Sequence, residues 1–263
     1  MRPLAPPVLE SVDILPAADS SNVEVLVTVK GGKESTGYIG LYFDETWEFH
    51  ADYVGWYDLD TLRWTVGKRS TPYPNYWCWK SHSSQMKILD HSEFDGGRVS
   101  MYPIQAFSRS DDRNHRKYSI NVRAVTLPME TYRYIKNLGD ISNGTGSLFT
   151  PNPGEMTCNV ACDSDPSVRV LGYVTVSLES SKRVFTDDRY YQQVPAPQWY
   201  LFLPDPTPIS FMNSYNQGNY PVDFLELIVD GMPVMGVYWG PKRCIDCVLS
   251  GGTRQKPDFW EDE

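Results

Sequence analysis

The clearest pattern along the chain is the alternation of apolar and more polar residues, which is typical of β-strands. Residues 23–29 are the best example, because Val23, Val25, Val27 and Val29 lie at every second position. Side chains with this spacing fall on one face of a strand. By the same pattern we predict strands at residues 23–29, 38–43, 46–53, 84–89, 99–107, 118–125 and 224–229.

Helical spacing of apolar residues is found after Leu127. Tyr132, Ile135 and Leu138 are three residues apart and can form one stripe on a helix. Pro128 suits the first turn of a helix, and Gly139 is a natural stop. We therefore predict one helix over residues 128–139.

A β-hairpin is predicted after this helix, where the period of the pattern changes to two. Its strands are Met156–Cys162 and Val170–Leu178, and Asp163–Pro166 has the composition of a turn. The overall prediction is a mainly β fold, an antiparallel β-sandwich or open barrel, with one short α-helix packed on it. We expect residues 1–22 to be a lead-in from a preceding domain and residues 23–263 to form a single β-rich domain.

Two segments give no regular pattern. Residues 59–76 resemble a long irregular loop, and long loops in compact domains often have a function. Residues 195–208 contain five prolines, so we expect an irregular connection there.

The charge of the chain restricts its partners. The net charge is −9 and the pI is about 5.0, whereas nucleic-acid binders present basic patches. The net negative charge argues equally against binding to anionic membrane surfaces. The chain also has no run of 18 apolar residues, which a transmembrane helix would need.

Aromatic residues are abundant, at 13% of the chain, and many lie in its first third. Trp56, Tyr57, Trp64 and Tyr73 could form a stacking platform for a glycan or a peptide if their rings are exposed. The alternative is ordinary packing of these rings against the sheets. We take the four residues as candidate ligand-binding residues.

No catalytic motif is found. The four histidines form no H-E-x-x-H motif, and there is no G-x-S-x-G elbow or phosphate-binding glycine loop. Glu45 and Glu48 flank Trp47, and carboxylates near an aromatic ring are typical of glycosidases. A simpler interpretation pairs these carboxylates with arginines or neighbouring strands. We predict no catalytic residue, no metal site and no cofactor.

The five cysteines leave three interpretations open. Cys244 and Cys247 form a C-x-x-C motif, which could be structural, part of a zinc site with Cys158 and Cys162, or a redox pair. We favour structural disulfides. In a regular strand Cys158 and Cys162 would be about 13 Å apart, too far to bond to each other.

Several segments resemble one known family. They are LPMETYRYIKNL at residues 127–138, GSLF at 146–149, VLGYVTVS at 170–177, KRVF at 182–185, ETWEFHA at 45–51, Cys78-Trp79, and CIDC, GGT and KPDFW at 244–260. In this order they resemble the Bacteroidetes outer-membrane lipoproteins that contain the domain of unknown function 4249. The resemblance spans nearly the whole chain.

The resemblance implies a longer parent protein. Members of the family carry a lipoprotein signal and an N-terminal sandwich domain, so we expect this chain to be a C-terminal region. It also implies an outer-membrane location through a lipid anchor, on the periplasmic or cell-surface side, and a TonB-dependent outer-membrane transporter as partner. No catalytic residues are implied.

Individual residues gain candidate roles from the resemblance. Cys78, Cys162, Cys244 and Cys247 match family positions and are the disulfide candidates, with three possible connectivities and Cys158 as the odd thiol. Thr61, within Asp60-Thr61-Leu62, resembles an O-glycan acceptor of Bacteroidetes envelope proteins.

We therefore expect a non-enzymatic envelope module that assists a TonB-dependent transporter by binding a glycan or peptide ligand or by docking. The first alternative is a glycan hydrolase that uses Glu45. The second is a structural protein of the cell surface.

Overall fold

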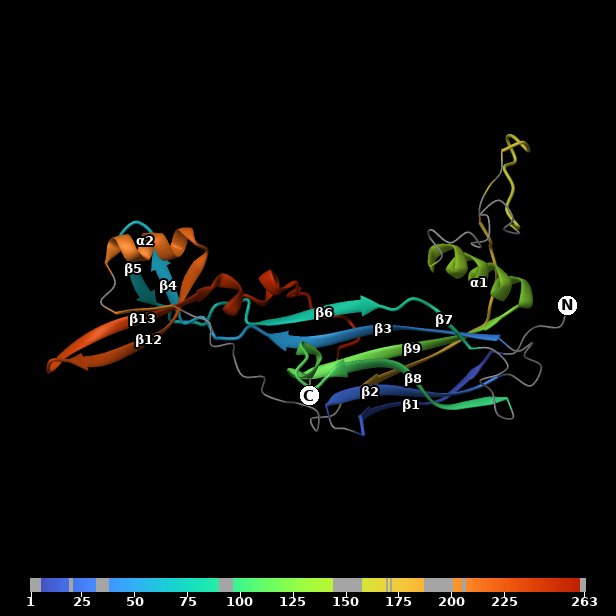
Figure 1. Cartoon of the computed structure of the whole chain (residues 1–263), viewed down its shortest axis with the longest axis horizontal. Coiled ribbons are helices and arrows are strands. Elements are labelled where there is room, and N and C mark those ends of the chain that lie inside the picture. The colour runs from blue at the N-terminus through green and yellow to red at the C-terminus, as the bar shows by residue number, and fades with distance from the viewer. Residues whose placement is uncertain are drawn as a thin grey trace. The chain divides into compact units, whose positions relative to one another are not determined.

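The computed structural model describes residues 6–18, 21–31, 38–89, 97–143, 158–168, 170, 172–186, 201–204 and 207–260. Strands dominate these residues, and all pairs for which a register is resolved are antiparallel. The sheets are sandwich-like, and none of the described sheets closes into a barrel. The structure thus confirms the predicted mainly β class (Figure 1).

The first sheet has the strand order β1–β2–β8. Its strands are β1 (Val8–Pro16), β2 (Asn22–Lys30) and β8 (Arg98–Ser108). The four alternating valines of β2 are at most 1% exposed, as their spacing predicts. β1 lies within the predicted lead-in and pairs with β2 along its length. Residues 8–16 are therefore part of the sheet.

The second sheet has the order β10–β9–β3–β6, and β7 pairs with β3. The strands are β10 (Glu179–Phe185), β9 (Lys117–Leu127), β3 (Tyr38–His50), β6 (Trp77–Ser83) and β7 (Lys87–Leu89). The predicted strands at 38–43 and 46–53 are largely one strand, β3. Apolar side chains of β3 and β9 supply much of the core.

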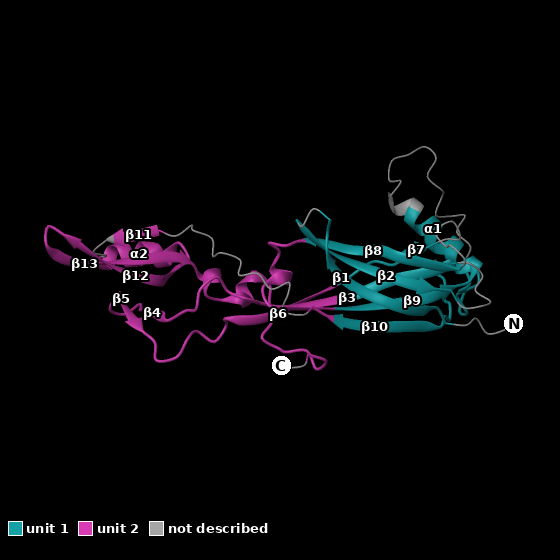
Figure 2. Cartoon of the chain, turned by 90° about the horizontal axis from the view of Figure 1, so that it is seen from below, with its two compact units in different colours: residues 1–44, 83–107, 120–184 teal, residues 45–82, 108–119, 185–263 magenta. Residues whose placement is uncertain are grey.

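The contacts divide the chain into two compact units (Figure 2). Unit 1 comprises residues 1–44, 83–107 and 120–184, and unit 2 comprises residues 45–82, 108–119 and 185–263. β3 and β9 have residues in both units. The division therefore does not decide whether residues 23–263 fold as one domain, and that boundary stays a prediction.

Unit 2 contains a third sheet with the order β11–β13–β12. Its strands are β11 (Leu201–Pro204), β13 (Met232–Pro241) and β12 (Asn219–Val229). Helix α2 (Pro208–Asn216) and the two-stranded sheet of β4 (Tyr57–Asp60) and β5 (Thr65–Lys68) belong to the same unit. Among the described residues, this unit also contains the short 3₁₀ helices η2 (Asp112–Asn114), η5 (Lys242–Cys244) and η6 (Cys247–Ser250).

Helix α1 (Met129–Asn143) of unit 1 confirms the predicted helix, although it continues past Gly139. The prediction of a hairpin after this helix is wrong for the residues that the structure describes, because residues 158–162 and 172–178 form no regular strands. The side chain of Asn159 bonds both the N–H and the C=O of Val174 instead. These side-chain hydrogen bonds replace the backbone hydrogen bonds of a β-ladder. Residues 144–157 lie outside the described part of the chain.

Two further expectations are corrected in unit 2. Residues 59–76 are not one long loop, because they include most of the β4–β5 hairpin. Helix α2 was not predicted, although Thr207 caps it by accepting a bond from the N–H of Ser210 and Pro208 occupies its first turn.

Candidate functional site

The β12–β13 hairpin is the most unusual surface of unit 2. Its register pairs Leu225 with Gly236, Leu227 with Val234 and Val229 with Met232, and Asp230-Gly231 forms the turn. Paired residues lie on the same face of a ladder, and that face alternates along each strand. The hairpin therefore has two distinct faces.

One face is covered within unit 2 at the end of the hairpin away from the turn. Val237 and Trp239 of β13 are each 1% exposed and form a core cluster with Phe211 of α2. Residues of β4, β5, β11, β12 and the β4–β5 turn pack against this cluster, namely Leu59, Trp64, Val66, Leu203 and Phe224. This face anchors the hairpin.

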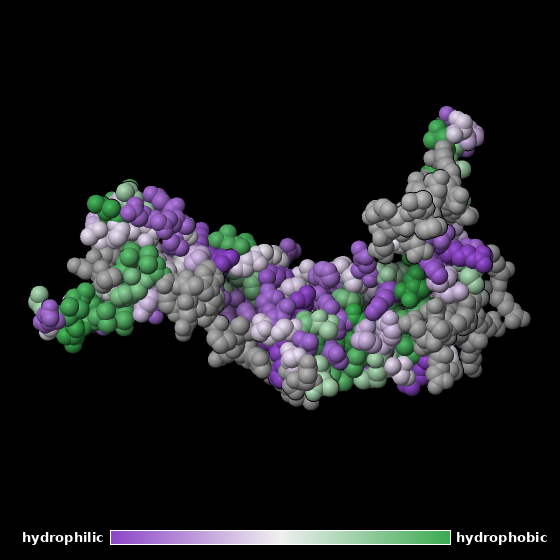
Figure 3. All heavy atoms as spheres, in the orientation of Figure 1, coloured by the Kyte–Doolittle hydropathy of each residue, from purple (hydrophilic) through white to green (hydrophobic). Residues whose placement is uncertain are grey.

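The opposite face is apolar and exposed. We call it the open face; it consists of Leu225, Leu227, Val229, Met232 and Val234. Val229 is 50% exposed and Met232 is 70% exposed, and only Val234 is half-buried. Ile228 and Met235 lie on the other side of the tip and are 78% and 50% exposed. Figure 3 shows hydrophobic surface over the β12–β13 hairpin on the face in view.

The third strand of the sheet does not cover this tip in the described part of the chain. β11 pairs with β13 only as far as Pro204 and Gly236. At Gly236 the ring of Phe202 packs so closely that a Cβ atom would lie 2.1 Å from it. The hairpin beyond Gly236 is therefore a two-stranded ribbon with apolar side chains on both sides.

The charged residues of the hairpin are all acidic. Residues 219–241 include Asp223, Glu226 and Asp230 but no lysine or arginine. A large apolar surface rimmed by polar groups is typical of an interaction site. Acidic groups near it favour a partner surface that carries basic groups.

The four predicted ligand-binding rings are all in unit 2, but they are not one exposed platform. Trp56 is 40% exposed. Tyr57 contacts the ring of Phe224, and Trp64 packs on the core cluster of Val237. Tyr73 is half-buried, and the guanidinium of Arg69 lies 5.5 Å from its ring centroid. Ligand binding by these residues stays a prediction, and Trp56 is its most accessible member.

The turn between β4 and β5 holds the O-glycosylation candidate. Asp60 accepts hydrogen bonds from the N–H groups of Leu62 and Arg63, which shapes the turn. Thr61 is exposed in it. Trp64 ends the turn with a φ of 53°, a conformation that costs energy for a bulky residue. Its packing against the core cluster holds it there.

A buried polar network surrounds Glu45, the residue of the hydrolase alternative. Glu45 is 0% exposed, and Arg113 donates to both of its carboxylate oxygens at 2.9 and 3.2 Å. The Tyr118 hydroxyl donates at 2.8 Å, and His82 Nδ1 lies 3.0 Å from Oε1. Trp47 contributes its ring, which lies 4.4 Å from the Arg113 guanidinium.

The electrostatics of the network are those of a structural cluster. Burial and the neighbouring Glu45 charge raise the pKa of Tyr118, so its hydroxyl stays protonated. Burial opposes the charge of Arg113, but its bonds to Glu45 and Asp111 outweigh this effect and raise its pKa. Arg113 bridges the two carboxylates. This arrangement gives no support to Glu45 as a catalytic acid or nucleophile, because its oxygens already accept bonds from several donors.

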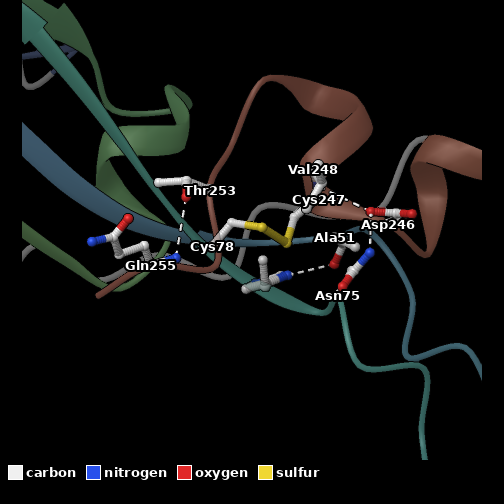
Figure 4. Close-up of a disulfide and its surroundings, with 9 residues drawn as sticks. Ala51, Asn75, Cys78, Asp246, Cys247, Val248, Thr253 and Gln255 are labelled. Atoms are coloured by element: carbon white, nitrogen blue, oxygen red, sulfur yellow. Dashed lines mark hydrogen bonds between the residues drawn. A yellow bond between two sulfur atoms is a disulfide. The ribbon is translucent and has the colours of Figure 1, made fainter. Parts of the chain in front are cut away.

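One disulfide joins Cys78 of β6 to Cys247 of η6, with Cα atoms 5.9 Å apart (Figure 4). The C-terminal segment then pairs with β6, because Thr253 and Trp79 exchange two backbone hydrogen bonds. Asp246 accepts bonds from Asn75 and from the N–H of Val248 next to the disulfide. The predicted use of cysteines in disulfides is confirmed for this one bond.

The other two disulfide candidates are thiols in the structure. Cys244 is buried, and burial together with the charge of Asp52 raises the pKa of its thiol to about 11. Hydrogen bonds from Ser164 and from the Asp165 N–H lower the pKa of Cys162. The C-x-x-C pair therefore does not close on itself, since Cys247 bonds to Cys78.

Two further features are absent from the described residues. These residues contain no group of three or more histidine, cysteine, aspartate or glutamate side chains that could hold a metal ion. No helix in the described part of the chain is long and apolar enough to cross a membrane.

Sequence reasoning missed the open face. It predicted only the strand that ends at Asp230-Gly231 and gave its side chains no role. An Asp-Gly pair between two apolar runs is a strong signal of a two-residue hairpin turn. The runs at 224–229 and 232–237 contain this signal. The exposure of the face could not be inferred from the pattern alone.

Fold and surface together define a mainly β protein with an exposed apolar hairpin and a buried polar network around Glu45. A family model described as "Domain of unknown function (DUF4249)" matches residues 2–183. The match covers more than half of the 263 residues, so the chain belongs to this family, as the resemblance indicates. Neither the curated proteins nor the solved structures compared with the chain contain a match.

Proposed function

We propose that this chain is a non-enzymatic docking module that binds another protein of the cell envelope through the β12–β13 hairpin. The exposure of the open face carries the proposal. Leaving several aliphatic side chains in water is unfavourable by roughly 25 cal/mol per Å² of apolar surface. A partner that covers the face would recover this free energy.

The partner in this proposal is a TonB-dependent outer-membrane transporter, and the parent protein is a lipoprotein of the same membrane. The family resemblance supports this choice. Because the hairpin is apolar and acidic, the complementary surface on the partner is an apolar groove bordered by lysine or arginine. The outer edge of β12 near the tip also offers backbone groups to which a partner strand could be added.

Co-purification tests the proposal. The tagged full-length parent is recovered from gently solubilised native outer membranes, and bound proteins are identified by mass spectrometry. The variant carries Leu227→Ser, Val229→Ser and Met232→Ser on the open face. Its matched control replaces three exposed apolar residues of other surfaces, with Leu62→Ser, Val176→Ser and Leu249→Ser.

We expect the wild type and the control to recover one transporter in stoichiometric amounts. The open-face variant should recover at least ~10-fold less, equivalent to about 1.4 kcal/mol of binding free energy. Equal recovery by all three proteins, or recovery of no transporter by the wild type, would overturn the proposal. In that case Trp56 and the surface around it would be the next target for ligand screening.

A further inference from the structure

Unit 1 contains a cavity of about 280 Å³ next to helix α1. Glu130, Arg133, Tyr134 and Asn137 line it from successive turns of one helix face, since residues three and four apart lie on the same side. Asn159 and Tyr173 line it from the chain that follows the helix. The cavity therefore has one helical wall and one extended wall.

The extended wall is fixed by several contacts. The carboxamide of Asn159 bonds the N–H and the C=O of Val174 at 2.7 and 2.6 Å. Tyr134 and Tyr173 stack with ring centroids 5.2 Å apart, and the hydroxyls of Thr131 and Thr175 lie 3.0 Å apart. These contacts join the wall to α1, so the cavity is formed before any ligand enters.

The edge of the cavity carries one acidic and one basic side chain. Glu130 and Arg133 are exposed at its edge, and no hydrogen bond or ion pair joins either side chain to another described residue. Asn137 adds an amide that can both donate and accept. The stacked rings of Tyr134 and Tyr173 both line the cavity.

We propose that this cavity binds a small zwitterion, an amino acid or a dipeptide, which carries one carboxylate and one ammonium group. Arg133 holds the carboxylate, because a guanidinium matches a carboxylate with two parallel hydrogen bonds. Glu130 holds the ammonium group, and Tyr134 and Tyr173 contact the organic part. The volume is slightly below the roughly 300–1,000 Å³ of pockets for drug-sized ligands, which suits a smaller molecule.

Nuclear magnetic resonance titration of the whole chain tests this inference. The probes are alanylalanine, its N-acetyl form, its C-terminal amide and glucose. We expect alanylalanine to shift the amide signals of α1 with a dissociation constant below ~1 mM, near 4 kcal/mol of binding free energy. Each blocked dipeptide and glucose should bind at least ~10-fold more weakly.

Two variants assign the roles. Arg133→Gln should remove the preference for alanylalanine over its amide, and Glu130→Gln should remove the preference over the N-acetyl form. Lys136→Gln, on α1 but outside the cavity lining, should behave as the wild type. No shift at ~10 mM, equal binding of glucose, or unchanged preferences in both variants would overturn the proposal. The experiment contains no protein partner, so its result is independent of the docking function.

Discussion

Two regions of unit 2 depart in opposite directions from the rule that polar groups are exposed and apolar groups are buried. Around Glu45 the chain buries a carboxylate completely and supplies it with donors from Arg113 and Tyr118. Along the β12–β13 hairpin it leaves Val229, Met232 and their neighbours in water. Each departure has a cost, but only the first is offset within the described structure.

The difference separates a structural region from the surface that we propose for interaction. Burying a charge is tolerated when hydrogen bonds and an opposite charge replace water. The Glu45 network meets this condition, so it needs no ligand. The exposed apolar face has no such compensation from the described residues, and a partner can supply it. A partner for unit 2 is therefore expected at the hairpin rather than at the carboxylates.

Removing the charge of Glu45 should have the largest effect on the free energy of unfolding. Glu45→Gln leaves the partly buried Arg113 guanidinium without its main counter-ion, and breaking such a pair costs about 3–5 kcal/mol. Urea unfolding measures the change. Glu226→Gln on the exposed hairpin is the matched control, with a change within about 0.5 kcal/mol. A small effect for Glu45→Gln would show that the network is not structural.

Removing the disulfide should lower the free energy of unfolding somewhat less than Glu45→Gln does. Replacing Cys78 and Cys247 together by serine frees a loop with a sequence separation of 169 residues. Removal of a native disulfide typically costs about 2–5 kcal/mol, largely through the entropy of the unfolded chain. Urea unfolding again provides the measurement, with Cys162→Ser as control. A variant as stable as the wild type would contradict the prediction.

Thiol reactivity should distinguish the buried interior of unit 2 from an accessible surface of unit 1. Cys244, with a pKa near 11, is almost entirely protonated at pH 8, whereas hydrogen bonds lower the pKa of Cys162. Since the thiolate is the nucleophile, alkylation of native protein should modify Cys162 at least ~100-fold faster than Cys244. Peptide mass spectrometry over time gives both rates. Equal rates would show that Cys244 is not protected.

The smallest expected effect concerns the stability of the hairpin itself. The open-face variant with Leu227→Ser, Val229→Ser and Met232→Ser removes side chains that contribute little packing, so the free energy of unfolding should change by about 0.5 kcal/mol or less per substitution. Val237→Ser, on the buried face of the same strand, should cost several times more. If the open-face variant unfolds as readily as Val237→Ser, the face is part of the core.

Much of the fold was predictable because local signals and tertiary structure agree. The alternating valines of β2 and the sequence from Pro128 to Gly139 gave a strand and a helix that the structure contains. β4 and β5 have four residues each and no clear alternation, so they were missed. The hairpin expected from Met156 fails where it is described, because Asn159 satisfies the backbone of Val174 with its side chain.

The candidate site was harder to predict than the fold. Strand periodicity shows which side chains share a face, but which face is covered depends on contacts far apart in sequence. Phe211 and Trp64 approach β13 from distant segments and bury one face, which leaves the other open. For the same reason Tyr57 and Trp64 could not be assigned to packing before the structure was known.

Site-specific photo-crosslinking in native outer membranes tests the docking function most directly. A photoreactive amino acid is placed at Val229 on the open face, and at Thr61 in the exposed β4–β5 turn as control. We predict that the protein with the probe at position 229 crosslinks to one transporter, and that the protein with the probe at position 61 does not. Crosslinks from position 61 alone, or from neither position, would contradict the assignment of the hairpin as the docking surface.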